Sequence, residues 1–327
     1  MTTKLLYVLV SSYADIYLEQ AYISMYSAKY YMPDCHITLL TDRLTSDSFI
    51  GERRVESSLA DEVIVVDINP CFTPQKRSRL LKTGAREYVK GDYLFIDCDT
   101  IIVRDLSDVD AFDYAIGACR DTHSSFPDNP YKGMCIKDVR KLGRNISEEK
   151  VYFNSGVMYV KDIPQTHKFY DEWKRNYELG YEKGVSMDQP SLALTNIDSD
   201  YLISEMPDIW NCELKHGIKY LKDAFIVHYL CTNTSINNDK QFFLLNDEEV
   251  LIEVKRTGQI TELIKSVVCD PFCGIAEVTH CFAGKDVGFF QTSIFAYFCN
   301  RYKKGRENTL IENFIRIGGR VKRFLKG

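Results

Sequence analysis

The chain has 327 residues, of which 45% are hydrophobic and 27% charged, and this composition excludes a disordered protein. The length suits two domains, or one large α/β domain with an appendage. The net charge is −5, yet residues 301–327 carry nine Lys or Arg and two Glu, a net +7 that leaves −12 on the first 300 residues. An acidic body of this kind argues against a nucleic-acid partner.

The predicted elements alternate along the chain between strands and helices. Strand patterns occur at 4–10, 36–41, 61–66, 93–96, 114–119, 153–160 and 224–227, and helical spacing occurs at 16–31, 78–89 and 166–177. This alternation predicts an α/β fold with a mostly parallel central sheet flanked by helices. We expect a loop over 121–145, which contains two prolines and two glycines, and a helical C-terminal appendage from about residue 233.

Targeting and cysteine patterns predict a cytoplasmic protein. The apolar run at 4–10 has no cleavage site after it, and no stretch reaches the roughly 18 apolar residues of a membrane span. The eleven cysteines form no dense framework, so we expect reduced thiols. A late cluster has a spacing that fits no zinc pattern; its members are Cys269, Cys273, His280 and Cys281.

The segment YLFIDCDTIIVRDL places two acids directly after the strand at 93–96. Because side chains alternate along a strand, Asp97 and Asp99 are expected on one face, at the sheet edge where such folds bind ligands. Two buried like charges favour a shared divalent cation that also contacts a diphosphate. The alternatives are two solvated acids, or a haloacid-dehalogenase-like phosphatase with Asp97 as its nucleophile.

Three further segments carry polar groups suited to a ligand. YFNSGVM opens a strand with the Asn154 amide, which can bind sugar hydroxyls, and with Ser155 and Gly156, which allow close approach. In MDQPS, Asp188 and Gln189 begin a predicted helix, where a plain Asp N-cap is the alternative. His228 follows the strand at 224–227 as a possible third metal ligand, although a lone His is more often structural.

Together these motifs resemble the family-8 retaining glycosyltransferases, the glycogenin-like and bacterial galactosyltransferase group with a GT-A fold. The order of nucleotide strand, DxD, FN(A/S)GV, DQ and strand-end His matches over residues 4–232. The resemblance implies a catalytic domain at 1–232, followed by a helical region at 233–327. It implies that Asp97, Asp99 and His228 hold Mn2+ (or Mg2+) against the donor diphosphate.

The resemblance also implies an activity and a donor site. The activity is transfer of a hexose, from UDP-galactose or UDP-glucose, to a saccharide or lipid-linked saccharide with retention of configuration, in surface polysaccharide synthesis. Catalytic roles fall on Asp188 and Gln189. The implied donor-binding residues are Leu9, Ser11, Tyr13, Lys82, Asp97, Cys98, Asp99, Asn154, Ser155, Asp188 and Gln189.

The sequence departs from the family in two places. The first strand is followed by Ser11-Ser12-Tyr13, where the family often has acidic and Asn residues. After His228 the family has a Lys that contacts the diphosphate, but here the next Lys is Lys240, so Lys240 or Lys82 is expected to substitute. A non-catalytic nucleotide-sugar-binding protein is the alternative that this departure raises.

The basic C-terminal tail can form an amphipathic helix. Its apolar residues are Ile311, Phe314, Ile315, Ile317, Val321, Phe324 and Leu325. Such a segment suits the surface of an anionic bilayer, which predicts peripheral contact with the inner face of a membrane. A solvated C-terminus is the alternative.

Overall fold

The structure is a computed structural model that describes residues 1–231, 243–275 and 292–293. Its strands are β1 Lys4–Leu9, β2 Ile37–Asp42, β3 Glu62–Val66, β4 Tyr93–Ile96, β5 Thr100–Ile102, β6 Ile116–Arg120, β7 Phe153–Val160, β8 Ile203–Glu205, β9 Cys212–Glu213 and β10 Ile226–His228. Its helices are α1 Tyr17–Tyr31, α2 Arg43–Ser46, α3 Glu52–Ser57, α4 Pro74–Thr83, α5 Ala85–Tyr88, α6 Lys132–Lys141, α7 Pro164–Glu182, α8 Gln189–Asp198, α10 Glu248–Thr257 and α11 Glu262–Cys269.

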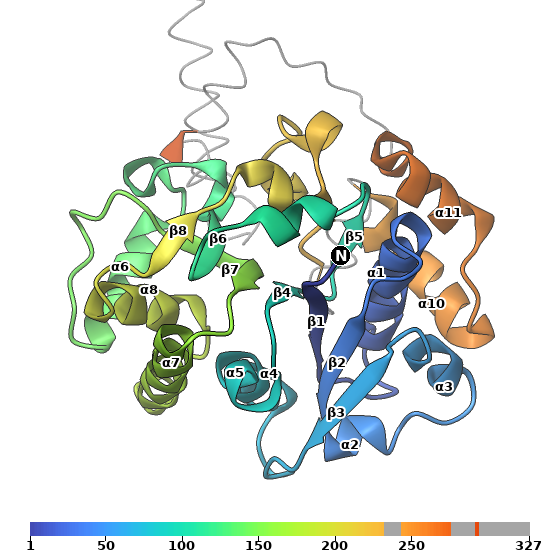
Figure 1. The fold of residues 1–327 in the computed structure, drawn as a ribbon, viewed down its shortest axis with the longest axis horizontal. Coiled ribbons are helices and arrows are strands. Elements are labelled where there is room, and N and C mark those ends of the chain that lie inside the picture. Colours follow the sequence, from blue (N-terminus) through green and yellow to red (C-terminus); the bar gives the residue numbers. More distant parts are fainter. Residues whose placement is uncertain (232–242, 276–291, 294–327) are drawn as a thin grey trace, which may run out of the picture.

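A seven-stranded sheet in the order β3-β2-β1-β4-β7-β6-β8 forms the centre of the molecule (Figure 1). The pairs β1–β2, β1–β4, β2–β3 and β6–β8 are parallel. Only β7 runs against its neighbours β4 and β6 within this sheet. The predicted mostly parallel α/β sheet is confirmed.

Alternating side chains bury both faces of the sheet, as expected for strands covered on two sides by helices. On the face covered by α1, the buried residues include Leu5, Tyr7, Leu9, Leu94, Ile96, Val157 and Tyr159. On the face covered by α4, α5 and α7, they include Leu6, Val8, Tyr93, Phe95, Met158 and Val160. The sheet is thus rigidly held, and its polar loops project from one edge of a packed core.

A second, three-stranded sheet in the order β5-β10-β9 begins where the first one ends. The chain passes from β4 to β5 through residues 97–99, and β10 pairs antiparallel with β5. Residues 97–99 therefore lie at the junction of the two sheets. The sequence patterns predict neither β5 nor β9, because strands of two or three residues are too short to show a period.

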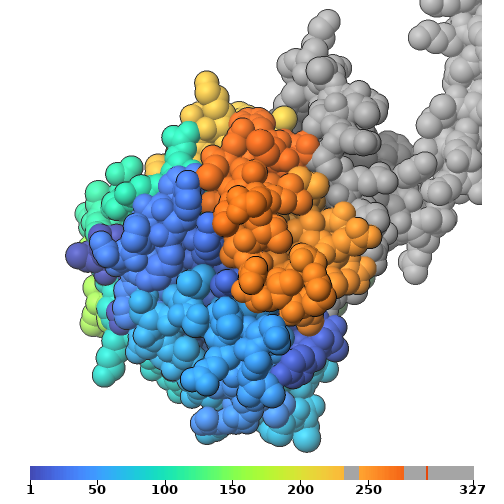
Figure 2. Space-filling model, turned by 90° about the vertical axis from the view of Figure 1, so that its right-hand side faces the viewer, coloured from blue at the N-terminus to red at the C-terminus, as the bar shows by residue number. Residues whose placement is uncertain are grey.

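The described C-terminal helix α10 packs against α1 and α3, and the Tyr31 hydroxyl of α1 donates to the Val268 carbonyl of α11 at 3.0 Å (Figure 2). Leu251, Val254 and Ile264 share a buried cluster with Ile23 of α1. The hydroxyl of Tyr22 donates a hydrogen bond to the Gly258 carbonyl at 3.1 Å. The domain division at 232/233 stays a prediction, while Lys240, His280, Cys281 and the basic tail lie outside the described residues.

One predicted element is wrong, and another is divided into two in the structure. The expected loop at 121–145 contains α6, whose Cys135 and Val139 are buried against Phe126 and Tyr152. The prolines before this helix and the glycines within and after it hide its periodicity. The expected helix at 78–89 is instead α4 and α5, separated at Gly84. Among the described residues, no helix is long and apolar enough to cross a bilayer.

Candidate functional site

Asp97, Asp99 and His228 meet at the junction of the two sheets. One possible ligand atom from each lies within 4.8 Å of those of the other two, the single such group among the described residues. The chain achieves this through a turn, because β4 ends at Ile96 and the expected strand alternation does not extend to Asp99. The three side chains predicted as metal ligands are nevertheless brought together.

A buried amide orients the His228 ring. Nδ1 of His228 lies 2.9 Å from Oδ1 of Asn211, while Nε2 lies 3.2 Å from Oδ1 of Asp99. The Asn211 amide nitrogen donates to Oδ1 of Asn154 at 3.0 Å, so Oδ1 of Asn211 faces the imidazole as an acceptor. Nδ1 therefore donates to Asn211, and Nε2 is the ring nitrogen that faces the carboxylates. Such an outer contact is typical of metal-binding histidines.

The two acids differ in their electrostatic surroundings. Burial raises the pKa of Asp97, Lys82 opposes this rise, and the nearby Asp99 adds to it. Burial also opposes ionisation of Asp99, but His228 and the backbone N–H of Cys231, 2.9 Å from Oδ2, lower its pKa below the ordinary value. The pair thus holds negative charge that a divalent cation would neutralise.

A second buried group lies directly beside these acids. Lys82 Nζ is 3.1 Å from Oδ1 of Asp97, 3.4 Å from Oδ2 of Asp188 and 3.2 Å from Oγ of Ser155. Arg79 Nε is 3.0 Å from the other oxygen of Asp188. Against the effect of burial, Arg79 and Lys82 hold the pKa of Asp188 well below its usual range. The Asp188 carboxylate makes no capping hydrogen bond, so the plain N-cap alternative is not supported.

A fourth acid, Asp121, accepts hydrogen bonds from both predicted amides. Its Oδ1 accepts hydrogen bonds from Asn154 Nδ2 at 3.1 Å and from Gln189 Nε2 at 3.0 Å, and its Oδ2 accepts one from Asn129 at 2.9 Å. Asp121 immediately follows β6 and is buried. The amides of Asn154 and Gln189 are therefore preorganised, with their orientations fixed by one carboxylate.

Gly156 makes room for His228. A Cβ at this position would lie 2.9 Å from Nδ1 of His228 and 2.8 Å from Oδ1 of Asn154, closer than side-chain carbons normally approach. The Gly156 carbonyl also accepts a hydrogen bond from the backbone N–H of Asp97 at 2.7 Å. The sequence predicts that Gly156 allows close approach of a ligand, and in the structure its missing side chain leaves space for the His228 imidazole.

Three further predicted donor residues lie at the end of β1, which is the neighbour of β4, or shortly after it. Leu9 ends β1 with its side chain in the core, so only its backbone can face a ligand. The Ser11 hydroxyl donates to Asp15 at 2.6 Å and accepts from Arg53 at 3.1 Å. Tyr13 is 58% exposed, with the Arg53 guanidinium 5.0 Å from its ring centre.

Cys98 differs from its acidic neighbours. Its thiol donates to the Val8 carbonyl at 3.5 Å, and burial together with Asp97 and Asp99 raises its pKa well above the ordinary value. This hydrogen bond connects the turn after β4 to β1.

The sequence motifs did not assign Arg79, Asp121 and Asn211 to the site. Arg79 stands three residues before Lys82 in one helix, so helical spacing could have placed both cations on the same face. Asp121 ends a predicted strand region, in the manner of Asp97, and that signal could have been read. Asn211 carries no signal in its neighbourhood, because its role depends on a contact with β10.

Comparison with solved structures finds glycosyltransferases among the structures to which this chain is similar. The apo form of GlyE from Streptococcus pneumoniae TIGR4 has a TM-score of 0.50 at 16% identity, covering 86% of this chain and 67% of that chain. Mouse xyloside xylosyltransferase 1, apo form, gives 0.47 at 12% identity, with 70% and 97% covered. The galactosyltransferase LgtC, in complex with donor and acceptor sugar analogs, gives 0.45 at 14% identity, with 70% and 87% covered.

These likenesses concern the fold. No protein-family model matches the sequence, and a search of curated proteins found no match. At 16% identity, the likeness to GlyE confirms the α/β fold of a GT-A glycosyltransferase that the motifs predict.

Proposed function

We propose that the protein is a metal-dependent retaining glycosyltransferase. It transfers a hexose from UDP-galactose or UDP-glucose to a saccharide or lipid-linked saccharide. The observation that supports this most is the meeting of Asp97, Asp99 and His228 next to the buried Lys82–Asp188 pair. The fold shared with GlyE is consistent with it.

The chemistry of the three converging side chains fits a divalent cation. Two carboxylates and one imidazole suit Mn2+ or Mg2+, and the contact between Asn211 and Nδ1 of His228 directs Nε2 toward the carboxylates. Asp97, Asp99 and His228 would hold the ion. When bound, it would neutralise negative charge that develops on the departing diphosphate.

The surrounding residues supply binding and orientation. Lys82 and Arg79 place two fixed cations beside the acids, where they offset the negative charge of a donor diphosphate. Asp188 offers its carboxylate to sugar hydroxyls, and the fixed amides of Asn154 and Gln189 offer further hydrogen bonds. Among the described residues, Lys82 is the candidate to replace the diphosphate-contacting Lys that the family has after its strand-end His.

Retention is what the resemblance to the family-8 glycosyltransferases implies, and the weak nucleophile in the site favours a route without a covalent intermediate. The Gln189 amide is a poor nucleophile, so no stable covalent intermediate is expected. The acceptor hydroxyl would enter on the face from which the diphosphate leaves, and the leaving phosphate would take its proton. Asp188, ionised and buried, would place negative potential near the positive charge that develops on the sugar.

The wider role is part of the same proposal. A lipid-linked acceptor in surface polysaccharide synthesis would explain a basic tail at the inner face of a membrane, on a protein that otherwise resides in the cytoplasm.

A donor panel tests this proposal. Thermal unfolding of the full chain is measured with UDP-galactose, UDP-glucose and other nucleotide sugars, with Mn2+ or with EDTA. A ligand at 100 times its Kd stabilises the native state by about 2.7 kcal/mol, so a true donor raises the Tm clearly, and only with the metal. Sugar release or transfer is then assayed with that donor.

The other outcomes separate the alternatives. Donor binding with neither transfer nor hydrolysis would indicate a non-catalytic nucleotide-sugar binder. Phosphate release from simple esters without any sugar donor would indicate the phosphatase alternative. No Tm shift with any nucleotide sugar would contradict the proposal.

A further inference from the structure

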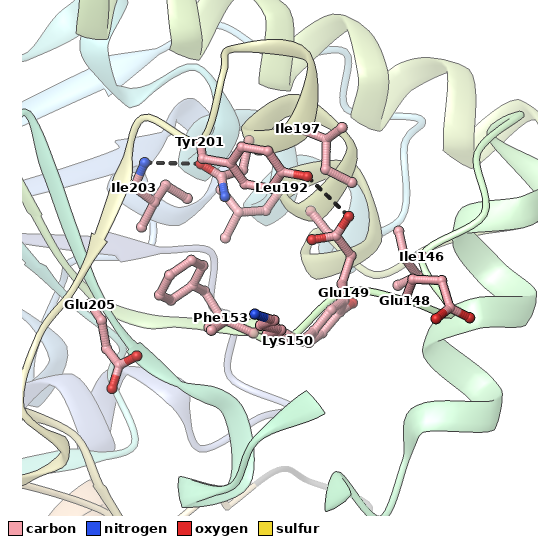
Figure 3. A pocket seen from close by; sticks show the side chains of 14 residues that line it. Ile146, Glu148, Glu149, Lys150, Phe153, Leu192, Ile197, Tyr201, Ile203 and Glu205 are labelled. Atoms are coloured by element: carbon pink, nitrogen blue, oxygen red, sulfur yellow. Dashed lines mark hydrogen bonds between the residues drawn. The ribbon is translucent and has the colours of Figure 1, made fainter. Parts of the chain in front are cut away.

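A cavity of about 520 Å3 opens between α8, β8 and the segment at 146–153 (Figure 3). This volume is within the range of small-molecule sites. Phe153, Leu192 and Ile197 form apolar parts of its lining, and Tyr201 lies across it. The cavity is separate from the Asp97–Asp99–His228 group, none of which lines it.

The aromatic ring of Tyr201 is held in place although it is 55% exposed. Its hydroxyl donates to Oε1 of Glu149 at 3.1 Å, and its backbone N–H donates to the Asn196 carbonyl at 2.8 Å. The Asn196 side chain in turn accepts from the backbone N–H of Ile203 at 2.9 Å. Because the Tyr201 ring is already held at its hydroxyl and at its backbone, a ligand that packs on its exposed face loses little conformational entropy in ordering it.

The charges around the cavity select against anions. The carboxylates of Glu148, Glu149 and Glu205 line it together with one cation, Lys150. Glu205 already pairs with Arg120, whose Nε lies 3.2 Å from its carboxylate. Carboxylates accept hydrogen bonds and repel phosphates and uronic acids, whereas saccharide hydroxyls are donors.

The cavity shares two elements with the donor site. Phe153 precedes Asn154 in β7, and its carbonyl accepts a hydrogen bond from Gln189 Nε2 at 3.3 Å. Leu192 follows Gln189 within the first turn of α8. Because successive strand residues point to opposite faces, Phe153 faces away from Asn154. The cavity is thus a neighbouring compartment with walls built on the same strand and helix.

We infer that this cavity is a second saccharide site, which binds a neutral or amine-bearing part of the acceptor chain away from its reacting end. Apolar faces of sugar rings pack on Tyr201 and Phe153, while hydroxyls donate to Glu149 and Glu148. The inference rests on the proposed function, since it assigns the bound chain to the acceptor. It also predicts that the cavity selects saccharides by their charge, and that this selectivity does not depend on the donor site.

A glycan array tests the site with the full chain. The array carries neutral, amino-sugar and uronic-acid or phosphate-bearing oligosaccharides, with tetralysine as a competitor. The wild type should bind neutral or amino-sugar chains, and Tyr201→Asn should bind them about tenfold more weakly. Asn tolerates the left-handed backbone of Tyr201, which has a φ of 58°, so this variant keeps the loop. Tyr30→Asn, another half-exposed tyrosine, on α1, is the control and should bind as the wild type does.

A charge variant sharpens the assignment. Glu148 is exposed, so Glu148→Lys should fold normally and should bind uronic-acid chains that the wild type rejects. The inference is overturned if no glycan binds, if Tyr201→Asn binds as tightly as the wild type, or if the wild type prefers anionic chains. Displacement of every bound glycan by tetralysine at equal concentration would also overturn it, in favour of a cationic peptide.

A variant of the donor site distinguishes failure of the proposed function from failure of the saccharide-site inference. Asp188→Asn should lose nucleotide-sugar binding and keep the array profile, because Asp188 does not line the cavity. An array profile that survives while no nucleotide sugar shifts the Tm would contradict the proposed function but not the saccharide site. A donor response without any bound glycan would contradict the saccharide site alone.

Discussion

Nδ1 of His228 lies 2.9 Å from Oδ1 of Asn211, and this contact determines which imidazole nitrogen faces Asp99. Because Asn211 is itself fixed by its hydrogen bond to Asn154, the ring has one favoured tautomer. The proposed metal-ligand set thus depends on a residue from the β8–β9 connection as well as on the turn at 97–99.

Asn211→Ala should weaken Mn2+ binding about 10- to 100-fold, the usual effect of losing an outer contact to a metal-binding histidine. Water-proton relaxation during Mn2+ titration measures this directly. Asn176→Ala removes another buried asparagine, in α7, and should leave the Mn2+ affinity unchanged. Equal affinities for Asn211→Ala and the wild type would show that the His228 ring needs no such support.

Gly156→Ala should displace the His228 imidazole and reduce Mn2+ affinity, because the new Cβ would lie 2.9 Å from Nδ1. Overpacking of this kind also costs about 1–3 kcal/mol in the free energy of unfolding, which urea denaturation measures. Gly133→Ala, in α6, meets no atom within 4 Å and is the matched control. Unchanged Mn2+ affinity in Gly156→Ala would contradict the assignment of His228.

Asp188→Asn should spare UDP binding and weaken UDP-hexose binding at least about tenfold, because its carboxylate is assigned to the sugar. The amide keeps the shape of the side chain, which avoids leaving Lys82 and Arg79 beside an empty space. Calorimetric titration with UDP and with UDP-hexose distinguishes the two ligands. Equal losses for both would place Asp188 at the diphosphate and not at the sugar.

The motifs predicted which residues come together in the site, but they did not predict the backbone arrangement that brings them together. Asp97, Asp99 and His228 converge as expected, although they do so through the turn between two sheets. The position of Asp121 after a predicted strand was a signal, but its contact with Gln189, 68 residues away, was not. Asn211 could not be ranked from one sequence, because its importance lies in a contact with His228, 17 residues away. Hydrogen bonds between distant segments have no periodic signature.

The buried strands could be predicted because uninterrupted apolar runs, such as LLYVL in β1 and YLFI in β4, are typical of strands that are covered on both faces. The region of α6 could not, because Pro127, Pro130 and Gly133 outweigh its weak apolar period. Its burial against Tyr152 appears only once the fold has formed, so tertiary packing decides that element.

A buried carboxylate on α3 should make stability depend on pH. Burial, with the nearby Glu19, raises the pKa of Glu56 from 4.5 to about 8. Between these two values the folded protein binds a proton that the unfolded chain releases, so the free energy of unfolding falls as the pH rises. Glu56→Gln, which cannot ionise, should show a smaller fall between pH 5 and pH 8 in urea denaturation.

Glu178→Gln, which changes an exposed acid on α7 that does not contribute to the Glu56 shift, is the control and should follow the wild-type pH profile. Identical pH profiles for Glu56→Gln and the wild type would show that Glu56 titrates normally in the folded protein.

The most direct test of the metal-dependent donor site is calorimetric titration of UDP-hexose into the wild type, Asp97→Asn and Asp99→Asn, each with Mn2+ and with EDTA. Each substitution removes one charge from a group whose possible ligand atoms lie within 4.8 Å of one another. The account predicts that the wild type binds the donor only with Mn2+, and that both variants fold but lose this binding. Mn2+-dependent donor affinity that is unchanged in either variant would contradict it.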